Sequence, residues 1–333
     1  MWLPNSREPH SITYFGVKKK EVIENLGSDE IDEIRSLLNG KLTQINTRAL
    51  KLLKEKGVVY QSHFFNDFDF SGKYSRQIIS YCNYTNFDKA LDIHQQIIET
   101  TFIVIGVGGA GSNAIMQLLS MGVRKFVLID PDIVELSNLN RQIIFSIESI
   151  GKPKVLEAKK YIHSITAGQC QVKPLQEDIL SLENMETIVS SNEKNFVVSS
   201  ADSHQVGIRR FVASTFYKLK IPYIFLGYYG MSARVGPMII DHNGACGICD
   251  SFIFNFEDMM ELAEGSSTVN IAPSSLSVNT LMAALFSNQI VQWLAGNMSK
   301  NSTYSIELDN LEIKTLETKK RNSCKICGEN KHV

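Results

Sequence analysis

The stretch VIGVGGAGSNAIMQLLSMGVRKFVLID, residues 104–130, places a cluster of glycines between two apolar runs and ends in an aspartate. The apolar runs predict buried strands, and the residues between them predict a helix that starts at the glycines. The glycines are Gly106, Gly108, Gly109 and Gly111. The first permits a sharp turn after the strand, and the next two let backbone N–H groups approach phosphate oxygens. The last lets the helix pack closely while its positive end points at the anion.

Asp130 stands at the tip of the second predicted strand, where a carboxylate can accept hydrogen bonds from two ribose hydroxyls. A strand, a glycine turn, a helix and an acid in this order predict a nucleotide-binding site. The stretch alone leaves two ligands open, a dinucleotide such as NAD and ATP.

The composition indicates an ordinary globular protein of 333 residues, with 44% hydrophobic and 21% charged residues. Lys plus Arg (34) nearly balances Asp plus Glu (35), so no basic field favours a nucleic-acid or membrane partner. No apolar run approaches the ~20 residues of a membrane span. The first residues, MWLPNSREPH, lack the order of a signal peptide, which predicts a cytoplasmic location.

An alternation of strands and helices follows the glycine stretch. It predicts a Rossmann-like, doubly wound α/β sheet that is mostly parallel. The predicted strands are 102–106, 126–130, 170–176, 196–200 and 222–227, and the helices between them are 111–121, 153–166, 181–190 and 203–219. Hairpin-like runs follow at 233–241, 303–310 and 312–318, with a long apolar helix over 274–296.

The first 65 residues have a different pattern and predict a small winged-helix-like module. The predicted elements are strands 12–16 and 20–26, capped helices 28–40 and 43–57, and a closing strand over 58–64. We expect residues 1–65 to recognise a peptide and residues 66–333 to form the catalytic domain. A decoration that only packs on the main domain is the alternative.

The residues after Asp130 favour ATP over NAD. No His, Cys or Tyr-x-x-x-Lys suited to hydride transfer is evident near the predicted turn. Asn138, Arg141 and Lys154 instead lie within one loop-plus-helix stretch. Two cations and an amide suit a triphosphate, whose charge must be held while pyrophosphate leaves.

The blocks GVGGAGSN, LID, VELSNLNRQ and GKPKVLEAKK resemble the ThiF/MoeB/HesA superfamily, adenylating enzymes related to ubiquitin-activating enzymes. The likeness covers residues 66–333. It implies that ATP is the nucleotide, that the glycines hold it, and that Asp130 binds the ribose. It further implies that Asn138, Arg141 and Gln142 of the SNLNRQ block contact the phosphates. Lys154 would neutralise the charge of the reacting phosphate, and Asp202 would bind Mg²⁺.

Two of these assignments have simpler alternatives. Asp202 follows the run FVVSSA and could instead cap the next helix. Arg76, in YSRQIIS, matches a family segment whose arginine reaches into the active site of the partner subunit. This match implies a homodimer, whereas the alternative is a solvated helix arginine.

Four of the six cysteines form two CxxC pairs, Cys246/Cys249 and Cys324/Cys327. This spacing predicts a metal site rather than disulfides, and a complete Cys₄ set predicts structural zinc without catalytic function. The resemblance implies the same zinc site. Cys82 and Cys170 stand apart and are expected to be ordinary loop and core residues.

The family resemblance also narrows the reaction. No cysteine lies between Cys249 and helix 274–296, so a thioester relay is not expected there. The front module and the blocks SAD and APSSLSVNTLMAALF are most similar to members that modify ribosomally made precursor peptides, such as the maturation enzymes of microcin C and pantocin. The expected activity is adenylation of a carboxyl group on such a peptide, in the biosynthesis of a peptide antibiotic.

Other functions remain open at this point. One is activation of a ubiquitin-like sulfur-carrier protein that ends in Gly-Gly. Another is an NAD-dependent oxidoreductase or a non-catalytic nucleotide-binding module. A phosphorylated carboxylate, formed with release of ADP, is the alternative intermediate.

Overall fold

The computed structural model describes most of the chain after residue 67. The described residues are 68–179, 188–189, 193–201, 207–229, 232–249, 274–298, 301–310 and 312–328, with short pieces at 2–4, 12–15, 20–23, 27–29, 31–32 and 51. The chain divides into two compact units, Met1–Asp92 and Ile93–Val333.

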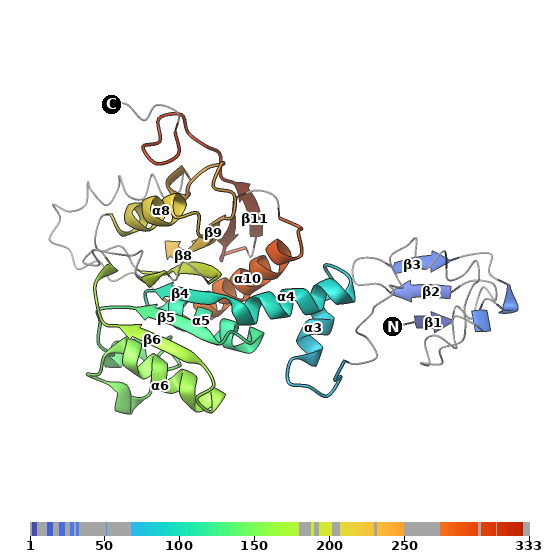
Figure 1. Cartoon of the computed structure of the whole chain (residues 1–333), viewed down its shortest axis with the longest axis horizontal. Helices are drawn as coiled ribbons and strands as arrows, with labels where there is room; N and C mark the ends of the chain where they lie inside the picture. Colours follow the sequence, from blue (N-terminus) through green and yellow to red (C-terminus); the bar gives the residue numbers. More distant parts are fainter. Residues whose placement is uncertain are drawn as a thin grey trace. The chain divides into compact units, whose positions relative to one another are not determined.

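The first unit contains a three-stranded antiparallel sheet in the order β1-β2-β3 (Figure 1). Its strands are β1 (Trp2–Pro4), β2 (Ile12–Phe15) and β3 (Lys20–Ile23), followed later by α3 (Ser75–Tyr81). The two strands predicted near residues 12 and 20 are confirmed, and β1 was not predicted. Residues 28–29, 31–32 and 51 are helical, as predicted, and the remainder of the two predicted helices and strand 58–64 lie outside the described residues.

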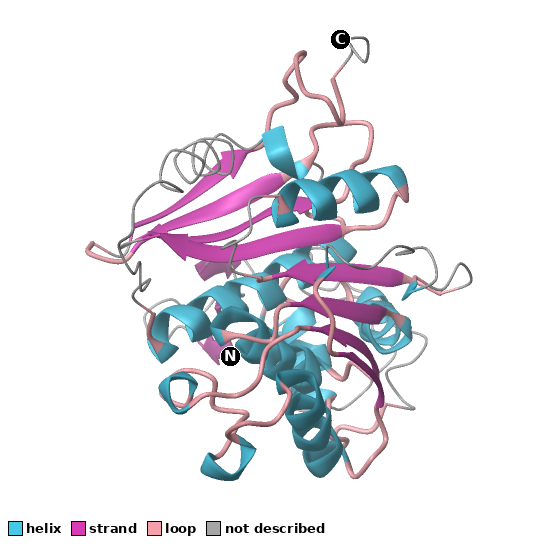
Figure 2. Ribbon diagram, turned by 90° about the vertical axis from the view of Figure 1, so that its left-hand side faces the viewer, coloured by secondary structure: helices cyan, strands magenta, loops and turns pink. Residues whose placement is uncertain are grey.

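The second unit contains an eight-stranded sheet in the order β11-β10-β9-β8-β7-β4-β5-β6 (Figures 1 and 2). The five strands from β4 to β8 are parallel to one another, and β9, β10 and β11 are antiparallel. The strands are β4 (Thr101–Ile105), β5 (Lys125–Ile129), β6 (Gln171–Leu175), β7 (Asn195–Ser199), β8 (Tyr223–Tyr229), β9 (Ser232–Ile239), β10 (Ser302–Glu307) and β11 (Glu312–Glu317).

The described helices of this unit follow the predicted alternation, whereas the predicted helix 181–190 lies outside the described residues except for 188–189. They are α4 (Phe87–Glu99), which runs in from the first unit, α5 (Gly109–Met121), α6 (Lys154–Thr166), α8 (Ile208–Lys218) and α10 (Leu276–Leu294). Short 3₁₀ turns are η1 (Leu136–Asn138), η2 (Ile147–Ser149) and η4 (Gly247–Cys249). Among the described residues, no helix has the length and hydropathy needed to cross a bilayer.

The sheet core follows from the alternation of side chains along each strand. In β4, Ile103 and Ile105 belong to the cluster that includes Val212 and Phe216 of α8. Phe102 points the other way and contacts Phe196, whose ring in turn lies near rings of α10. Helices cover both faces of the central strands, so β4, β5 and β7 are buried along nearly their whole length, and the predicted doubly wound α/β sheet is confirmed.

The strand order positions the candidate site. From β4 the chain moves to β5 and β6 on one side and then returns to β7 and β8 on the other side. The order therefore reverses between β4 and β7, and loops on the two sides separate at the carboxyl ends of these strands. In open α/β sheets, such a switch point is where ligands bind.

Candidate active site

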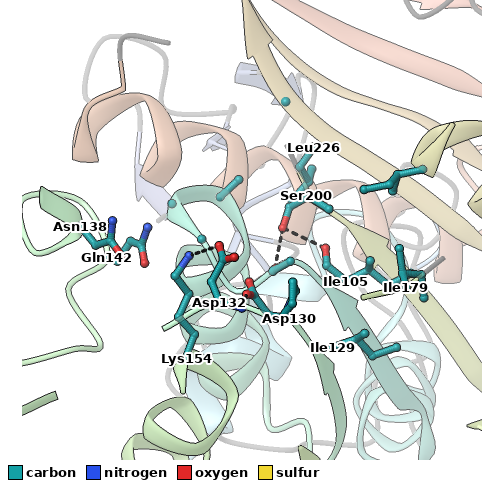
Figure 3. A pocket seen from close by; sticks show the side chains of 18 of the residues that line it. Ile105, Ile129, Asp130, Asp132, Asn138, Gln142, Lys154, Ile179, Ser200 and Leu226 are labelled. Carbon is teal, nitrogen blue, oxygen red and sulfur yellow. Dashed lines mark hydrogen bonds and ion pairs between the residues drawn. The ribbon is translucent and has the colours of Figure 1, made fainter. Parts of the chain in front are cut away.

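A pocket of about 450 Å³ lies at this switch point, within the size range of small-molecule sites. Its walls come from the carboxyl ends of β4, β5, β7 and β8, the loop after β6, and the segment 129–142. Figure 3 shows the side chains that converge on it. Every glycine of the predicted turn except Gly111 lines the pocket, as do Asp130, Asn138, Arg141, Gln142 and Lys154.

The glycine turn is sterically required. Gly106 has φ +85°, and a Cβ there would lie 2.6 Å from the Ala201 nitrogen. A Cβ on Gly111 would clash with the Gly106 carbonyl oxygen. By contrast, a Cβ on Gly108 would meet only the Gln142 Nε2 atom, 3.9 Å away. The first two positions are thus closed by protein, whereas Gly108 faces the open pocket.

Helix α5 begins at this turn with no side-chain cap. The first backbone N–H groups of a helix have no partner within the helix, and together with the dipole they favour an anion. The first intrahelical bond here runs from Ser112 N–H to the Gly108 carbonyl. Gly109 and Ala110, which precede Ser112 in α5, line the pocket, where a phosphate can accept hydrogen bonds from their N–H groups.

Ser200 holds the other side of the turn and was not predicted as a site residue. Its hydroxyl donates to the Gly106 carbonyl at 2.8 Å, and its N–H donates to the Ile105 carbonyl, also at 2.8 Å. Both contacts join β7 to the glycine turn across the switch point (Figure 3). In the sequence Ser200 is only a serine after a predicted strand, because its partner Gly106 is 94 residues away.

Asp130 is 4% exposed and already accepts two backbone hydrogen bonds. Its Oδ2 atom accepts from the Val107 N–H at 2.5 Å and its Oδ1 atom from the Asp132 N–H at 2.9 Å. Burial raises the pKa of this carboxyl above its usual range, and the charge of Lys154 and the two N–H groups oppose that rise. Each oxygen has a further lone pair that can accept from a ribose hydroxyl. The predicted role of Asp130 in binding the ribose is therefore compatible with its geometry.

Lys154 begins α6 and is 7% exposed. Its ammonium group forms a 2.7 Å ion pair with Asp132, and both groups line the pocket (Figure 3). A buried ammonium group needs an anionic partner. Asp132 supplies that partner in this structure, and a phosphate is an anion that could also do so.

The SNLNRQ block lies on one side of this ion pair (Figure 3). The Asn138 Oδ1 atom accepts from the Glu135 N–H, which fixes the 3₁₀ turn η1. Arg141 donates to the Ser137 carbonyl at 2.7 Å and keeps part of its surface exposed. Gln142 is 3% exposed, and its Oε1 atom has no hydrogen-bond partner among the described residues. A ligand hydroxyl or a metal-bound water would supply the missing donor.

The charge of the described lining is unfavourable to a polyphosphate by itself. Two cations, Arg141 and Lys154, face five carboxylates, which are Asp130, Asp132, Glu135, Glu177 and Asp178. Glu177 and Asp178 follow β6 and were not predicted, because their place depends on the strand order. A bound triphosphate in this lining needs additional positive charge.

Two predicted residues cannot be placed in the pocket. Asp202 lies outside the described residues. Arg76 is an exposed residue of α3 in the first unit. The roles assigned to both stay predictions.

The four cysteines of the two CxxC pairs converge in a separate, buried cluster. Their sulfur atoms all lie within 4.8 Å of one another, with 3.5 Å between Cys246 and Cys324 and 3.3 Å between Cys249 and Cys327. Tetrahedral zinc thiolates have sulfur–sulfur separations of about 3.8 Å. Hydrogen bonding to Cys249 and Cys327, together with burial, raises the pKa of the Cys246 thiol. This donor set can hold a zinc ion.

The cysteine cluster packs against β8, the last of the parallel strands before the antiparallel part of the sheet. A Cβ on Gly247 would lie 2.5 Å from the Phe225 ring, and the Gly247 N–H donates to the Tyr223 hydroxyl. Arg321 donates to the Ile248 carbonyl at 2.7 Å. This hydrogen bond joins the two CxxC turns, called the knuckles below, one at Cys246–Cys249 and the other at Cys324–Cys327. All four sulfur positions belong to protein side chains, which leaves no ligand position for catalysis.

The sequence of residues 74–327 matches the model of the ThiF family. The chain belongs to the ThiF family. The molybdopterin-synthase adenylyltransferase of Escherichia coli (strain K12) is 25% identical over 259 residues, which cover 77% of this chain and 96% of that protein. The sulfur carrier protein ThiS adenylyltransferase of the same organism is 45% identical over 89 residues, or 27% of this chain. The chain spans only about a third of the length of that ThiF-family relative (33%).

Solved structures show the same fold over nearly the whole chain. The crystal structure of E. coli MccB with AMPCPP and MccA has a TM-score of 0.78 at 21% identity and covers 97% of each chain. The structure of PaaA has a TM-score of 0.68 at 22% identity, over 93% of this chain and 96% of PaaA. The predicted resemblance to the ThiF/MoeB/HesA family is thereby confirmed, with MccB and PaaA among its structural neighbours.

Proposed function

We propose that this protein is an ATP-dependent adenylyltransferase that activates a carboxyl group. The observation that carries the proposal is the buried Lys154 at the wall of a pocket whose glycine turn presents the start of α5. The curated ThiF-family relatives are named adenylyltransferases, and a solved structure of MccB is titled with ATP. The ribose would lie on Asp130 and the phosphates between α5 and Lys154.

The proposed reaction needs no strong general base. An ionised substrate carboxylate attacks the α-phosphorus of ATP, the bond from that phosphorus to the bridging oxygen breaks, and pyrophosphate leaves. An acyl-adenylate remains, ready for attack by a nucleophile. Lys154, Arg141 and the N–H groups of α5 would stabilise the charge that develops during this exchange.

The excess of carboxylates in the lining supports two further parts of the proposal. Mg²⁺, held in part by Asp202, would neutralise phosphate charge between the acids. Arg76 from a second copy of the chain would add the missing cation, which makes the active form a homodimer. Exposed apolar side chains in the chain segment that includes and follows the SNLNRQ block, notably Leu136 (71%) and Ile147 (76%), support a contact with another copy.

We further propose that the substrate is a ribosomally made precursor peptide and that residues 1–65 bind its leader segment. The likeness to MccB, solved with MccA, extends across 97% of this chain and so includes the N-terminal part. An extended peptide could pair with an edge of the β1-β2-β3 sheet. The same likeness supports biosynthesis of a modified peptide as the process.

A sulfur-carrier protein is the second candidate substrate. The relatives named for ThiS and for molybdopterin synthase support it. Adenylation of a carrier protein would use the same pocket and the same attack on the α-phosphorus of ATP.

Release of pyrophosphate distinguishes the two substrates. The full chain is incubated with ATP, Mg²⁺ and either a short peptide encoded beside its gene or a carrier protein ending in Gly-Gly. We expect release with the peptide alone, and loss of peptide binding but not of ATP binding on deletion of residues 1–65. Release only with the carrier protein would replace the peptide proposal by the second candidate.

A further inference from the structure

Helix α10 begins directly against the glycine turn. Asn279, in its first turn, is fully buried at 0% exposure. A Cβ built on Gly109 would lie 2.8 Å from the Asn279 Nδ2 atom and 3.0 Å from its Oδ1 atom. The amide of Asn279 therefore lies in contact with Gly109, which lines the pocket, whereas Asn279 does not line it.

The position of this amide is fixed at its own end of α10. The Asn279 Nδ2 atom donates to the Ser275 carbonyl at 2.8 Å and to the Ser274 hydroxyl at 3.1 Å. Both acceptors lie just before the first residue of α10, so a movement of the amide would cost both hydrogen bonds. The side chain that contacts Gly109 is therefore itself held in place by two hydrogen bonds.

The next residue makes a second connection from α10 to the same turn. The Thr280 hydroxyl donates to the Asn113 Oδ1 atom at 2.9 Å. Asn113 in turn donates to the Gly109 carbonyl at 2.9 Å and to the Arg141 carbonyl at 3.2 Å. The first turn of α10 is therefore joined to both sides of the pocket, the glycine turn and the SNLNRQ block.

The Asn279 Oδ1 atom has no hydrogen-bond partner among the described residues. A buried acceptor without a donor lowers stability, and an apolar side chain of the same size would avoid that cost. The two hydrogen bonds of Nδ2 account for one half of the amide and leave Oδ1 without a donor. The contact of this amide with Gly109 suggests a role beyond the stability of α10.

We propose that Asn279 is a positioning residue for the phosphates of ATP. It holds Gly109, and with it the start of α5, in the position from which the N–H groups of α5 reach a phosphate, and it does not touch the nucleotide itself. This inference rests on the proposed ATP site. It adds a residue that lies far along the chain from Gly109, Asn138 and Gln142 and that only the fold brings next to the glycine turn.

Gln289 provides a matched control on the same helix. It is also 0% exposed, and neither its Oε1 nor its Nε2 atom has a hydrogen-bond partner among the described residues. It lies ten positions after Asn279 and does not line the pocket. Truncation of either amide to alanine leaves a cavity in α10, but only one truncation removes the support of Gly109.

The test is the dissociation constant of the full chain for ATP and for adenosine, measured by calorimetry alongside thermal unfolding. We expect Asn279→Ala to weaken ATP binding by about tenfold or more, because small displacements of binding groups are costly. Adenosine, which has no phosphate, should bind as it does to the wild type. Gln289→Ala should lower the melting temperature without changing either constant.

Unchanged ATP binding by a folded Asn279→Ala chain would overturn the inference, as would an equal loss in Gln289→Ala. If Asn279→Ala does not fold, Thr280→Val tests the second connection, with weaker ATP binding expected and unchanged binding contradicting the inference. A wild-type chain that fails to bind ATP would reject the proposed function as well. Binding by the wild type with no difference among the variants rejects only the role of Asn279.

Discussion

Lys154 and Asp132 form an ion pair of 2.7 Å in which the lysine side chain is 9% exposed and the aspartate side chain 61% exposed. The lysine is thus held inside the pocket by a partner that water can solvate on its own. Because Asp132 is much more exposed than Lys154, a bound phosphate could replace Asp132 as the partner of the lysine, and water would then solvate the Asp132 carboxylate. The lysine would be kept in place before ATP arrives.

Lys154→Ala should lower the turnover of ATP by about a hundredfold or more, since it removes a charge that stabilises the transition state. Lys160→Ala is the matched control, because Lys160 is an exposed lysine of α6 paired with Glu157. Its turnover should stay near that of the wild type. Equal losses in the two variants would contradict a specific role for Lys154.

Substitutions of two glycines should separate folding from binding. Gly111→Ala should lower the melting temperature, because its Cβ would clash with the Gly106 carbonyl. Gly108→Ala should fold, since its Cβ has open space, but should weaken ATP binding by occupying the path of a phosphate. A Gly108→Ala chain that binds ATP like the wild type would place the phosphates elsewhere.

The raised pKa of Asp130 predicts a specific pH dependence of stability. Because burial makes the folded state bind this proton more tightly than the unfolded state, protonation stabilises the fold. This contribution is complete below the ordinary value of 3.8 and is lost as the pH rises through the raised pKa. Relative to Asp130→Asn, the wild type should gain free energy of unfolding as the pH falls through that window. Urea unfolding at several pH values measures the difference, and a difference that does not change with pH would contradict the assignment.

The cysteine cluster should contain one zinc ion per chain by elemental analysis. Cys324→Ser should lose the metal and lower the melting temperature, because the fold then lacks the link between its two knuckles. Cys82→Ser should keep the metal, since Cys82 is outside the cluster. Full zinc content in the Cys324→Ser chain would show that the ligands are different.

The proposed homodimer predicts complementation between two inactive variants. Arg76→Ala and Lys154→Ala chains should each be inactive, and a mixture should recover about a quarter of the activity. That fraction follows because half of the randomly mixed dimers are mixed, and each of these has one intact site of two. No recovery from a mixture shown to exchange subunits would contradict an arginine supplied by the partner.

Much of the site could be predicted because its signals are local in the sequence. The glycine turn, Asp130 and Lys154 stand beside the strand and helix ends that position them, and the CxxC spacing already defines a pair of knuckles. The alternation of strands and helices likewise predicts the parallel sheet and the antiparallel strands after it.

The residues that were missed depend on contacts across the fold. Ser200 contacts Gly106 only because β7 lies beside β4, and Glu177 and Asp178 face the pocket only because β6 is at the edge of the sheet. Asn279 contacts Gly109 through the packing of α10 on α5. None of these neighbours is marked by spacing or composition, so sequence patterns alone could not identify them.

The exchange of labelled pyrophosphate into ATP tests the central claim most directly. The wild-type chain is mixed with ATP, Mg²⁺, radiolabelled pyrophosphate and the precursor peptide. Reversible adenylation predicts labelled ATP that appears only when the peptide is present and that is lost in Lys154→Ala. Peptide-dependent formation of ADP and phosphate, with no label entering ATP, would contradict attack at the α-phosphorus.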